Sequence, residues 1–167
     1  MVKIFVTVGS TGFDTLVASV CSTQFLESAK REGFDEIVVQ YGASGACFTP
    51  PRDLLPVRVS GFSYSNSIEE HYDSASLIVS HAGSGSILAA LRRGIPLVVA
   101  INDRLMDNHQ RELADALAEM NHLVVSKPSE LAVALRKREY RTLAPYPPGN
   151  PRPIGSILDQ EVFEHSK

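Results

Sequence analysis

Two segments of the chain combine glycine with hydroxyl side chains directly after runs of β-branched residues. They are Gly9-Ser10-Thr11-Gly12 and His81-Ala82-Gly83-Ser84-Gly85-Ser86. Glycine lets a backbone approach a ligand closely, and the N–H groups and dipole at the start of a following helix favour phosphate. Each segment by itself could be an ordinary tight turn. Two such segments in one chain favour a phosphate-binding site.

Three familiar glycine-containing motifs do not fit these segments. A P-loop needs a lysine after its last glycine, and neither segment has one. The dinucleotide fingerprint G-x-G-x-x-G needs a third glycine where Leu88 stands. A hydrolase nucleophile elbow needs G-x-S-x-G, which is also missing. The segments therefore predict phosphate binding without identifying the nucleotide.

A second polar cluster follows the apolar run over residues 97–100. Its members are Asn102, Asp103, Asp107, Asn108, His109 and Gln110. Asp107 and Gln110 have the spacing of a capping box, which explains those two residues alone. Side chains that both donate and accept hydrogen bonds suit a hydroxyl-rich sugar. The histidines show no H-x-x-x-H spacing, so the sequence does not support a metal site.

Alternating strands and helices must position these clusters. We expect strands over residues 2–8, 36–40, 57–62, 76–80, 96–100 and 123–125, and helices over 13–31, 67–73, 87–93, 108–121 and 128–138. This order predicts an α/β fold, a Rossmann-like three-layer sandwich with a mainly parallel sheet. The weak strand 57–62 could run in either direction. Parallel sheets bind ligands beyond the carboxyl ends of their strands, where the polar clusters fall.

Length and composition exclude several classes of protein. The 167 residues suit one domain. A formal net charge of −3 argues against nucleic acid as the main partner. Apolar runs are too short for a membrane span, which needs about 18 residues. The two cysteines are too few for a disulfide framework, which favours a reduced, cytoplasmic setting.

The end of the chain differs from the rest. Residues 145–153 are rich in proline, and an apolar stripe at helical spacing follows over 154–163. We therefore divide the chain into a ligand-binding domain, residues 1–141, and a proline-rich strap with a C-terminal helix, residues 142–167. The helix either folds back on its own domain or docks on another chain.

The residues around these clusters resemble one enzyme family. They are residues 5–11, residues 77–86 through the H-A-G-S-G-S segment, and residues 94–110, which end in M-D-N-H-Q. The chain resembles the cytosolic catalytic subunit of the two-chain UDP-N-acetylglucosamine transferase of dolichol-linked oligosaccharide synthesis. It is more distantly similar to the C-terminal half of the bacterial peptidoglycan transferase that uses the same donor.

The resemblance implies half of a GT-B glycosyltransferase, the half that binds UDP-GlcNAc. It implies a membrane-anchored partner subunit that binds the acceptor and is contacted partly through the C-terminal helix. The implied reaction transfers N-acetylglucosamine to GlcNAc-diphosphodolichol with inversion, at the cytosolic face of the endoplasmic reticulum. No cofactor and no metal are implied.

The resemblance also implies roles for single residues. Gly9, Ser10 and Thr11 would border the donor diphosphate; Gly83, Ser84, Gly85 and Ser86 would face its phosphates; and Asn108, His109 and Gln110 would face the sugar. Relatives often carry an acidic residue for the ribose where this chain has Ala89. His81 and His109 are the candidates for a general base. The alternatives are a non-catalytic nucleotide-binding module and a nicotinamide-dependent oxidoreductase using Asp103.

Overall fold

A computed structural model of the chain describes residues 1–51, 57–101 and 108–147, with the side chain of Asn108 excluded. The strands are β1 (Lys3–Thr7), β2 (Glu36–Gln40), β3 (Arg58–Phe62), β4 (Leu77–His81), β5 (Leu97–Ala100) and β6 (Val124–Ser126). The α-helices are α1 (Asp14–Val20), α2 (Thr23–Arg31), α3 (Ile68–Asp73), α4 (Ser84–Arg92), α5 (Asn108–Glu119) and α6 (Leu131–Lys137). Short 3-10 helices are η1 (Gly45–Cys47), η2 (Pro128–Glu130) and η3 (Glu139–Thr142).

The strands form one six-stranded sheet in the order β3-β2-β1-β4-β5-β6. Every described pair of neighbouring strands is parallel, including β2 with β3, which answers the question of direction left open for residues 57–62. The chain moves outward from β1 to β3 and then returns to the middle of the sheet to begin β4. This reversal places a topological switch point between β1 and β4, where open α/β sheets bind ligands.

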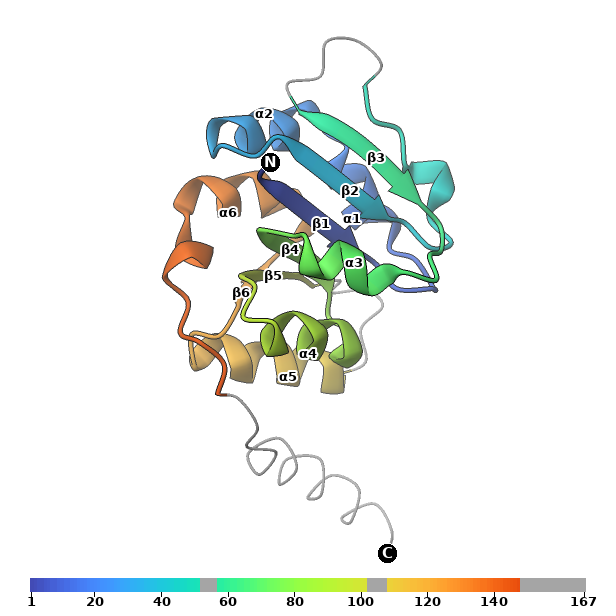
Figure 1. Cartoon of the computed structure of the whole chain (residues 1–167). Coiled ribbons are helices and arrows are strands. Elements are labelled where there is room, and N and C mark those ends of the chain that lie inside the picture. Colours follow the sequence, from blue (N-terminus) through green and yellow to red (C-terminus); the bar gives the residue numbers. More distant parts are fainter. Residues whose placement is uncertain (52–56, 102–107, 148–167) are drawn as a thin grey trace, which may run out of the picture.

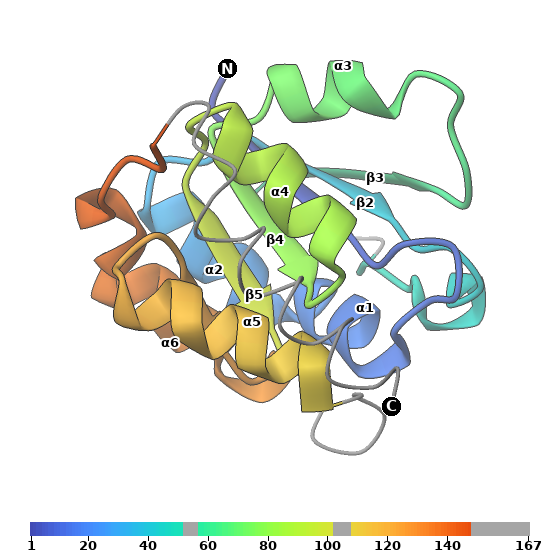
Figure 2. The ribbon, with the colours of Figure 1, turned by 90° about the horizontal axis from the view of Figure 1, so that it is seen from below.

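Helices cover both faces of the sheet, which confirms the three-layer sandwich (Figures 1 and 2). Buried apolar residues of α1, α2 and α6 pack against one face, and those of α3, α4 and α5 pack against the other. The central strands are apolar on both faces because helices shield both. This packing on both faces fixes the carboxyl ends of β1 and β4 in position.

Several helix boundaries differ from the sequence prediction, two of them at the site-bearing part of the fold or in its first helix. The helix expected over residues 13–31 is two helices, because Ser22 adopts an extended conformation and its side chain accepts a hydrogen bond from the N–H of Phe25, 3.3 Å away. This is an N-cap, which begins α2 afresh. Asp14 lies in the first turn of α1 and is not its cap. Helix α4 begins at Ser84, three residues earlier than expected.

Residues 143–147 extend along the body of the domain. The N–H of Ala144 donates to the carbonyl of Asn121 at 2.8 Å, and the ring of Tyr146 meets that of His122 edge-on at 5.4 Å. Leu143 and Tyr146 pack against the two core clusters. The start of the predicted strap thus rests on its own domain, while the predicted helix over 154–163 lies outside the described residues.

Within the described ranges, no helix has both the length and the apolar character needed to cross a bilayer.

Candidate donor-binding site

The two glycine-containing segments lie side by side at the switch point. Thr7 at the end of β1 is paired in register with Ser80 of β4. Because the strands are parallel, the chain leaves both at the same edge of the sheet. The structure therefore brings together the two segments that the sequence placed about seventy residues apart.

The imidazole of His81 fills the space between the two segments. A Cβ atom added to Gly9 would lie 3.0 Å from its Cε1, and a Cβ added to Gly83 would lie 2.3 Å from its Nε2. His81 can therefore keep its position only because neither Gly9 nor Gly83 has a side chain. Gly9 also has a φ of +70°, which L-residues rarely adopt.

His81 is held as a neutral imidazole. Its Nδ1 lies 3.4 Å from the backbone carbonyl of Thr7, which can only accept, so Nδ1 carries the hydrogen. Burial lowers the pKa of His81, and the hydrogen bond to Thr7 offsets only part of that effect. A neutral ring with hydrogen on Nδ1 leaves a lone pair on Nε2.

The first glycine segment, residues 9–12, lies against the loop that follows β2. A Cβ atom on Gly42 would lie 2.4 Å from the carbonyl oxygen of Gly9, and one on Gly12 would lie 2.5 Å from the Oγ of Ser44. These close approaches hold residues 9–12 against a neighbouring loop. Ser10 and Thr11 remain exposed at the edge of the sheet.

The second segment ends at the amino terminus of α4. Gly83 is the N-cap residue and offers no side chain for capping, and the first intrahelical hydrogen bond runs from the N–H of Ile87 to the carbonyl of Gly83 at 3.0 Å. The preceding N–H groups of the first turn therefore have no partner within the helix. Ser84 and Gly85 are exposed. This terminus can accept a phosphate group by hydrogen bonding and by the helix dipole.

A row of buried polar side chains lies beneath the two segments. Gln40 and Thr7 end β2 and β1, Ser80 is the last residue but one of β4, and Thr7 is paired in register with both. Thr7 donates a hydrogen bond from Oγ1 to Oε1 of Gln40. Tyr72 of α3 is also buried, and burial raises its pKa above the ordinary value.

The predicted sugar-facing residues begin α5, which follows β5, the neighbour of β4. His109 and Gln110 are exposed there, and His109 Nδ1 lies 4.0 Å from Glu112 Oε2. The side chain of Asn108, and the predicted residues Asn102, Asp103 and Asp107, lie outside the described part of the chain. The topology therefore places His109 and Gln110 beyond the same sheet edge as the glycine segments.

Ala89 lies on α4 and is partly buried. It packs against the core cluster under that helix, and its carbonyl accepts a hydrogen bond from Nη1 of Arg93 at 2.9 Å. A methyl group cannot bind ribose hydroxyls, so any ribose contact in this protein must come from other atoms. In the described ranges, no three metal-binding side chains come together as a possible metal site.

Three residues of the site were not singled out as candidates from the sequence. Thr7 and Gln40 could have been noticed, because each is a polar residue that directly follows three apolar residues at the end of its strand. Tyr72 carried no such signal. It belongs to a separate short helix, and only the packing of α3 on the sheet sets its ring edge-on against that of Phe5 in β1.

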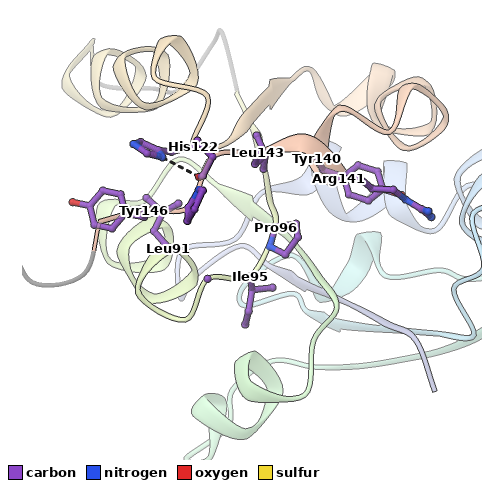
Figure 3. Close-up of a pocket in the computed structure, with 11 residues that line it drawn as sticks. Leu91, Ile95, Pro96, His122, Tyr140, Arg141, Leu143 and Tyr146 are labelled. Carbon is purple, nitrogen blue, oxygen red and sulfur yellow. Dashed lines mark hydrogen bonds between the residues drawn. The ribbon is translucent and has the colours of Figure 1, made fainter.

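A distinct pocket of about 180 Å³ lies at the opposite edge of the sheet (Figure 3). It is formed where residues 143–146 cross the amino ends of β5 and β6, and Pro96, His122 and Tyr146 contribute to its wall. Figure 3 shows that the His122 and Tyr146 side chains lie on the same side of this wall. Because the sheet is parallel, this pocket is separate from the glycine segments.

Comparison with known proteins agrees with this geometry. Residues 3–149 match the glycosyltransferase family 28 C-terminal domain. The UDP-N-acetylglucosamine transferase subunit ALG13 of Eremothecium gossypii is 33% identical, over 93% of this chain and 90% of that protein. The subunit of the same name from Homo sapiens is 40% identical over 72% of this chain. An NMR solution structure of ALG13 has a TM-score of 0.70 and 28% identity, and 94% of each chain is covered.

The relatives differ greatly in length. This chain spans only about a tenth of the human and mouse relatives that it matches, but nearly all of the fungal one. The residues that match the family domain, 3–149, include both glycine segments. This chain belongs to the glycosyltransferase family 28 C-terminal domain family, and the relatives compared here are named UDP-N-acetylglucosamine transferase subunits.

Proposed function

We propose that this chain is the donor-binding catalytic subunit of a glycosyltransferase that moves N-acetylglucosamine from UDP-GlcNAc to GlcNAc-diphosphodolichol. The observation that carries the proposal is the position of His81, whose ring lies against both Gly9 and Gly83. The two glycine segments therefore lie next to each other, beside the amino terminus of α4. The names of the relatives, which are UDP-N-acetylglucosamine transferase subunits, support the identity of the donor.

In this reaction the bond between the sugar and the diphosphate breaks, and negative charge develops on the departing UDP. The free N–H groups at the start of α4 are placed to stabilise that charge, since preorganised donors cost no reorganisation during the reaction. Ser10 and Thr11 at the neighbouring segment would border the same group.

The acceptor hydroxyl must lose a proton to a general base. His81 and His109 remain the candidates on this chain. His81 has an Nε2 lone pair but is confined between two glycines, whereas His109 is exposed on α5. A base supplied by a partner subunit is a third possibility that fits a divided active site.

We further propose that the chain works with a membrane-anchored, acceptor-binding subunit. The name "subunit" in the relatives supports a partner. The lipid acceptor lies in a membrane, so recruitment to the cytosolic face of the endoplasmic reticulum by that partner follows from the same proposal. The strap and the predicted helix over residues 142–167 are the proposed contact.

The proposal is tested by reconstituting the chain with its partner and measuring transfer. Ser84→Ala and Gln110→Ala should each lower activity while the melting temperature stays unchanged. Ser76→Ala at the amino end of β4 and Gln24→Ala on α2 are matched controls that should retain activity. Full activity of both site variants would show that the site is wrongly placed.

Ligand choice distinguishes the alternatives. UDP-GlcNAc and UDP should raise the melting temperature of the full chain, whereas GDP-mannose and NADH should not. Stabilisation by NADH would instead favour the oxidoreductase, although Leu88 stands where that fold's third glycine belongs. UDP-GlcNAc binding without any transfer by the reconstituted pair would favour a non-catalytic nucleotide-binding module.

A further inference from the structure

Gln40 is a buried polar residue that the proposed reaction does not use. It ends β2, is 6% exposed, and is paired in register with Thr7 at the end of β1. Its Oε1 accepts a hydrogen bond from the Thr7 hydroxyl, which in turn accepts from the N–H of Gly9 at 3.5 Å. The oxygen of the amide is therefore engaged, and its two N–H hydrogens are the part left for a ligand.

The amide nitrogen of Gln40 has no hydrogen-bond partner among residues 1–51, 57–101 and 108–147. In those same ranges, every side-chain nitrogen or oxygen that is fully enclosed does have a partner. The nitrogen must therefore reach an opening, although the rest of the side chain is buried. A donor without a partner costs free energy unless it meets water or a ligand, so this opening is a candidate binding position.

Gln40 lies on the sheet face that α3, α4 and α5 cover. Side chains two residues apart in a strand point to the same face, and Val38 and Phe5 belong to the core cluster beneath these helices. Gln40 and Thr7 follow them by two residues and therefore share that face. The open amide thus lies on the side of the sheet where α4 presents its amino terminus.

An aromatic ring borders Gln40 on the side away from Thr7. Phe62 of β3 is paired in register with Gln40, packs against the same core cluster and is partly exposed. Its ring is held against His71 of α3, with a centroid distance of 4.6 Å and an interplanar angle of 28°. A hydrogen-bond donor beside a fixed aromatic ring is a combination that proteins use to bind a planar, polar base.

The position of Gln40 relative to α4 suits the base of a nucleotide. β1 separates β2 from β4, and neighbouring strands lie about 4.8 Å apart, so Gln40 lies about 10 Å to the side of the strand that leads into α4. A nucleoside diphosphate whose phosphates lie at the start of α4 holds its base one ribose away from them. Such a ligand would extend across Thr7 toward Gln40 and Phe62.

We propose that Gln40 binds the base of the donor nucleotide, with its amide N–H group donating to a carbonyl oxygen of uracil beside the ring of Phe62. This inference rests on the proposed function. Uracil carries carbonyl acceptors at its C2 and C4 positions, and the Gln40 amide, with its oxygen engaged by Thr7, offers only donors. Part of the recognition of the nucleoside thereby comes from the end of β2 and not from α4.

The experiment compares three full-length chains by calorimetric titration: wild type, Gln40→Met and Gln24→Met. Methionine has about the length of glutamine but no N–H group. We expect Gln40→Met to weaken UDP binding about fivefold, the size of one lost hydrogen bond, and to leave the affinity for ribose 5-diphosphate, which has no base, unchanged. Gln24→Met makes the same change on the exposed surface of α2 and should leave both affinities unchanged.

Ligand analogues test the same contact in the wild-type chain. In 2-thio-UDP and 4-thio-UDP, a sulfur atom, which is a weaker acceptor, replaces one of the two carbonyl oxygens of the base. We expect one of these analogues to bind the wild-type chain more weakly than UDP, and Gln40→Met to bind that analogue and UDP about equally. The wild-type comparison does not depend on whether Gln40→Met folds.

Unchanged UDP affinity in a folded Gln40→Met would overturn the inference. Equal losses for UDP and ribose 5-diphosphate would also overturn it, because Gln40 would then act on the phosphates, the ribose or the fold. So would a wild-type chain that binds UDP and both thio analogues equally. A wild-type chain that binds neither UDP nor UDP-GlcNAc would instead show that the proposed function is wrong, and the role of Gln40 would fall with it.

Discussion

The Nε2 atom of His81 occupies the place that a side chain on Gly83 would need, at 2.3 Å from an ideal Cβ. Gly83 has an ordinary extended conformation, with φ −70° and ψ 126°, so its backbone would accept alanine without strain. Glycine is therefore needed at position 83 because the His81 imidazole occupies the space that a larger side chain would fill. Gly85, two residues later, has nothing within 4 Å of its Cβ position.

This contrast predicts opposite effects for two neighbouring substitutions. Gly83→Ala should displace His81, lower stability by about 1–3 kcal/mol through overpacking, and weaken UDP-GlcNAc binding. Gly85→Ala lies in the first turn of α4 and should raise stability by up to about 0.5 kcal/mol, because alanine is the better helix former. Urea unfolding measures both changes. If the two substitutions changed the free energy of unfolding equally, the position of His81 against Gly83 would be contradicted.

We expect the protein to lose stability in mild acid, because the pKa values of His81 and His71 are lowered in the folded chain. Burial lowers the pKa of His81 below its ordinary value of 6.5, and burial followed by nearby Lys3 lowers the pKa of His71, with Glu70 and Glu36 opposing. The unfolded chain therefore binds these protons first as the pH falls. The free energy of unfolding should have its highest value above about pH 6.5 and should decrease as the pH falls below that value.

His81→Asn should remove part of this pH dependence. Asparagine keeps an N–H that can donate to the carbonyl of Thr7 but does not titrate. The measurement compares unfolding midpoints of wild type and variant at about pH 7.5 and pH 5.5. The drop should be smaller in the variant, and an identical drop would show that His81 does not contribute.

Arg93 should contribute to the docking of α3 on α4. It donates from Nε to Asp73 at 2.7 Å, pairs with Glu69, and lies over the ring of Tyr72. Its acidic partners are largely exposed, so Arg93→Ala should cost only about 1 kcal/mol. Arg92→Ala, on the exposed neighbour, serves as the control. A smaller difference at high salt would confirm the electrostatic part.

Glu32 should link η3 to the end of α2. Its side chain is only 6% exposed and accepts from Nε of Arg138 at 2.6 Å, and its backbone carbonyl accepts from Nη2 of Arg141 at 2.9 Å. Glu32→Gln should lower the free energy of unfolding by about 1–2 kcal/mol, because it removes a charge-assisted hydrogen bond.

The control for Glu32 is Glu27→Gln, which breaks the exposed pair with Arg31. It should change stability by less than about 0.5 kcal/mol. Equal effects of the two substitutions in thermal unfolding would argue against a structural role for the buried carboxylate.

Much of the fold could be predicted from local patterns. Strands such as β1 and β4 are short, apolar and β-branched, which is typical of a parallel sheet covered on both faces. The parallel arrangement then places the glycine segments at one edge without any structure. The break at Ser22 was missed because apolar spacing continues across it, and only the cap reveals two helices.

The residue types that end the strands can be read from the amino-acid sequence, and with them the gathering of glycine, serine and a histidine at the switch point. How these residues contact one another follows from the tertiary packing. His81 lies beside Gly9, and the ring of Tyr72 in α3 lies edge-on against that of Phe5 in β1, through contacts between segments distant along the chain. Periodicity reports the direction of a side chain from its own element, whereas these contacts depend on how α3 and α4 pack against the sheet.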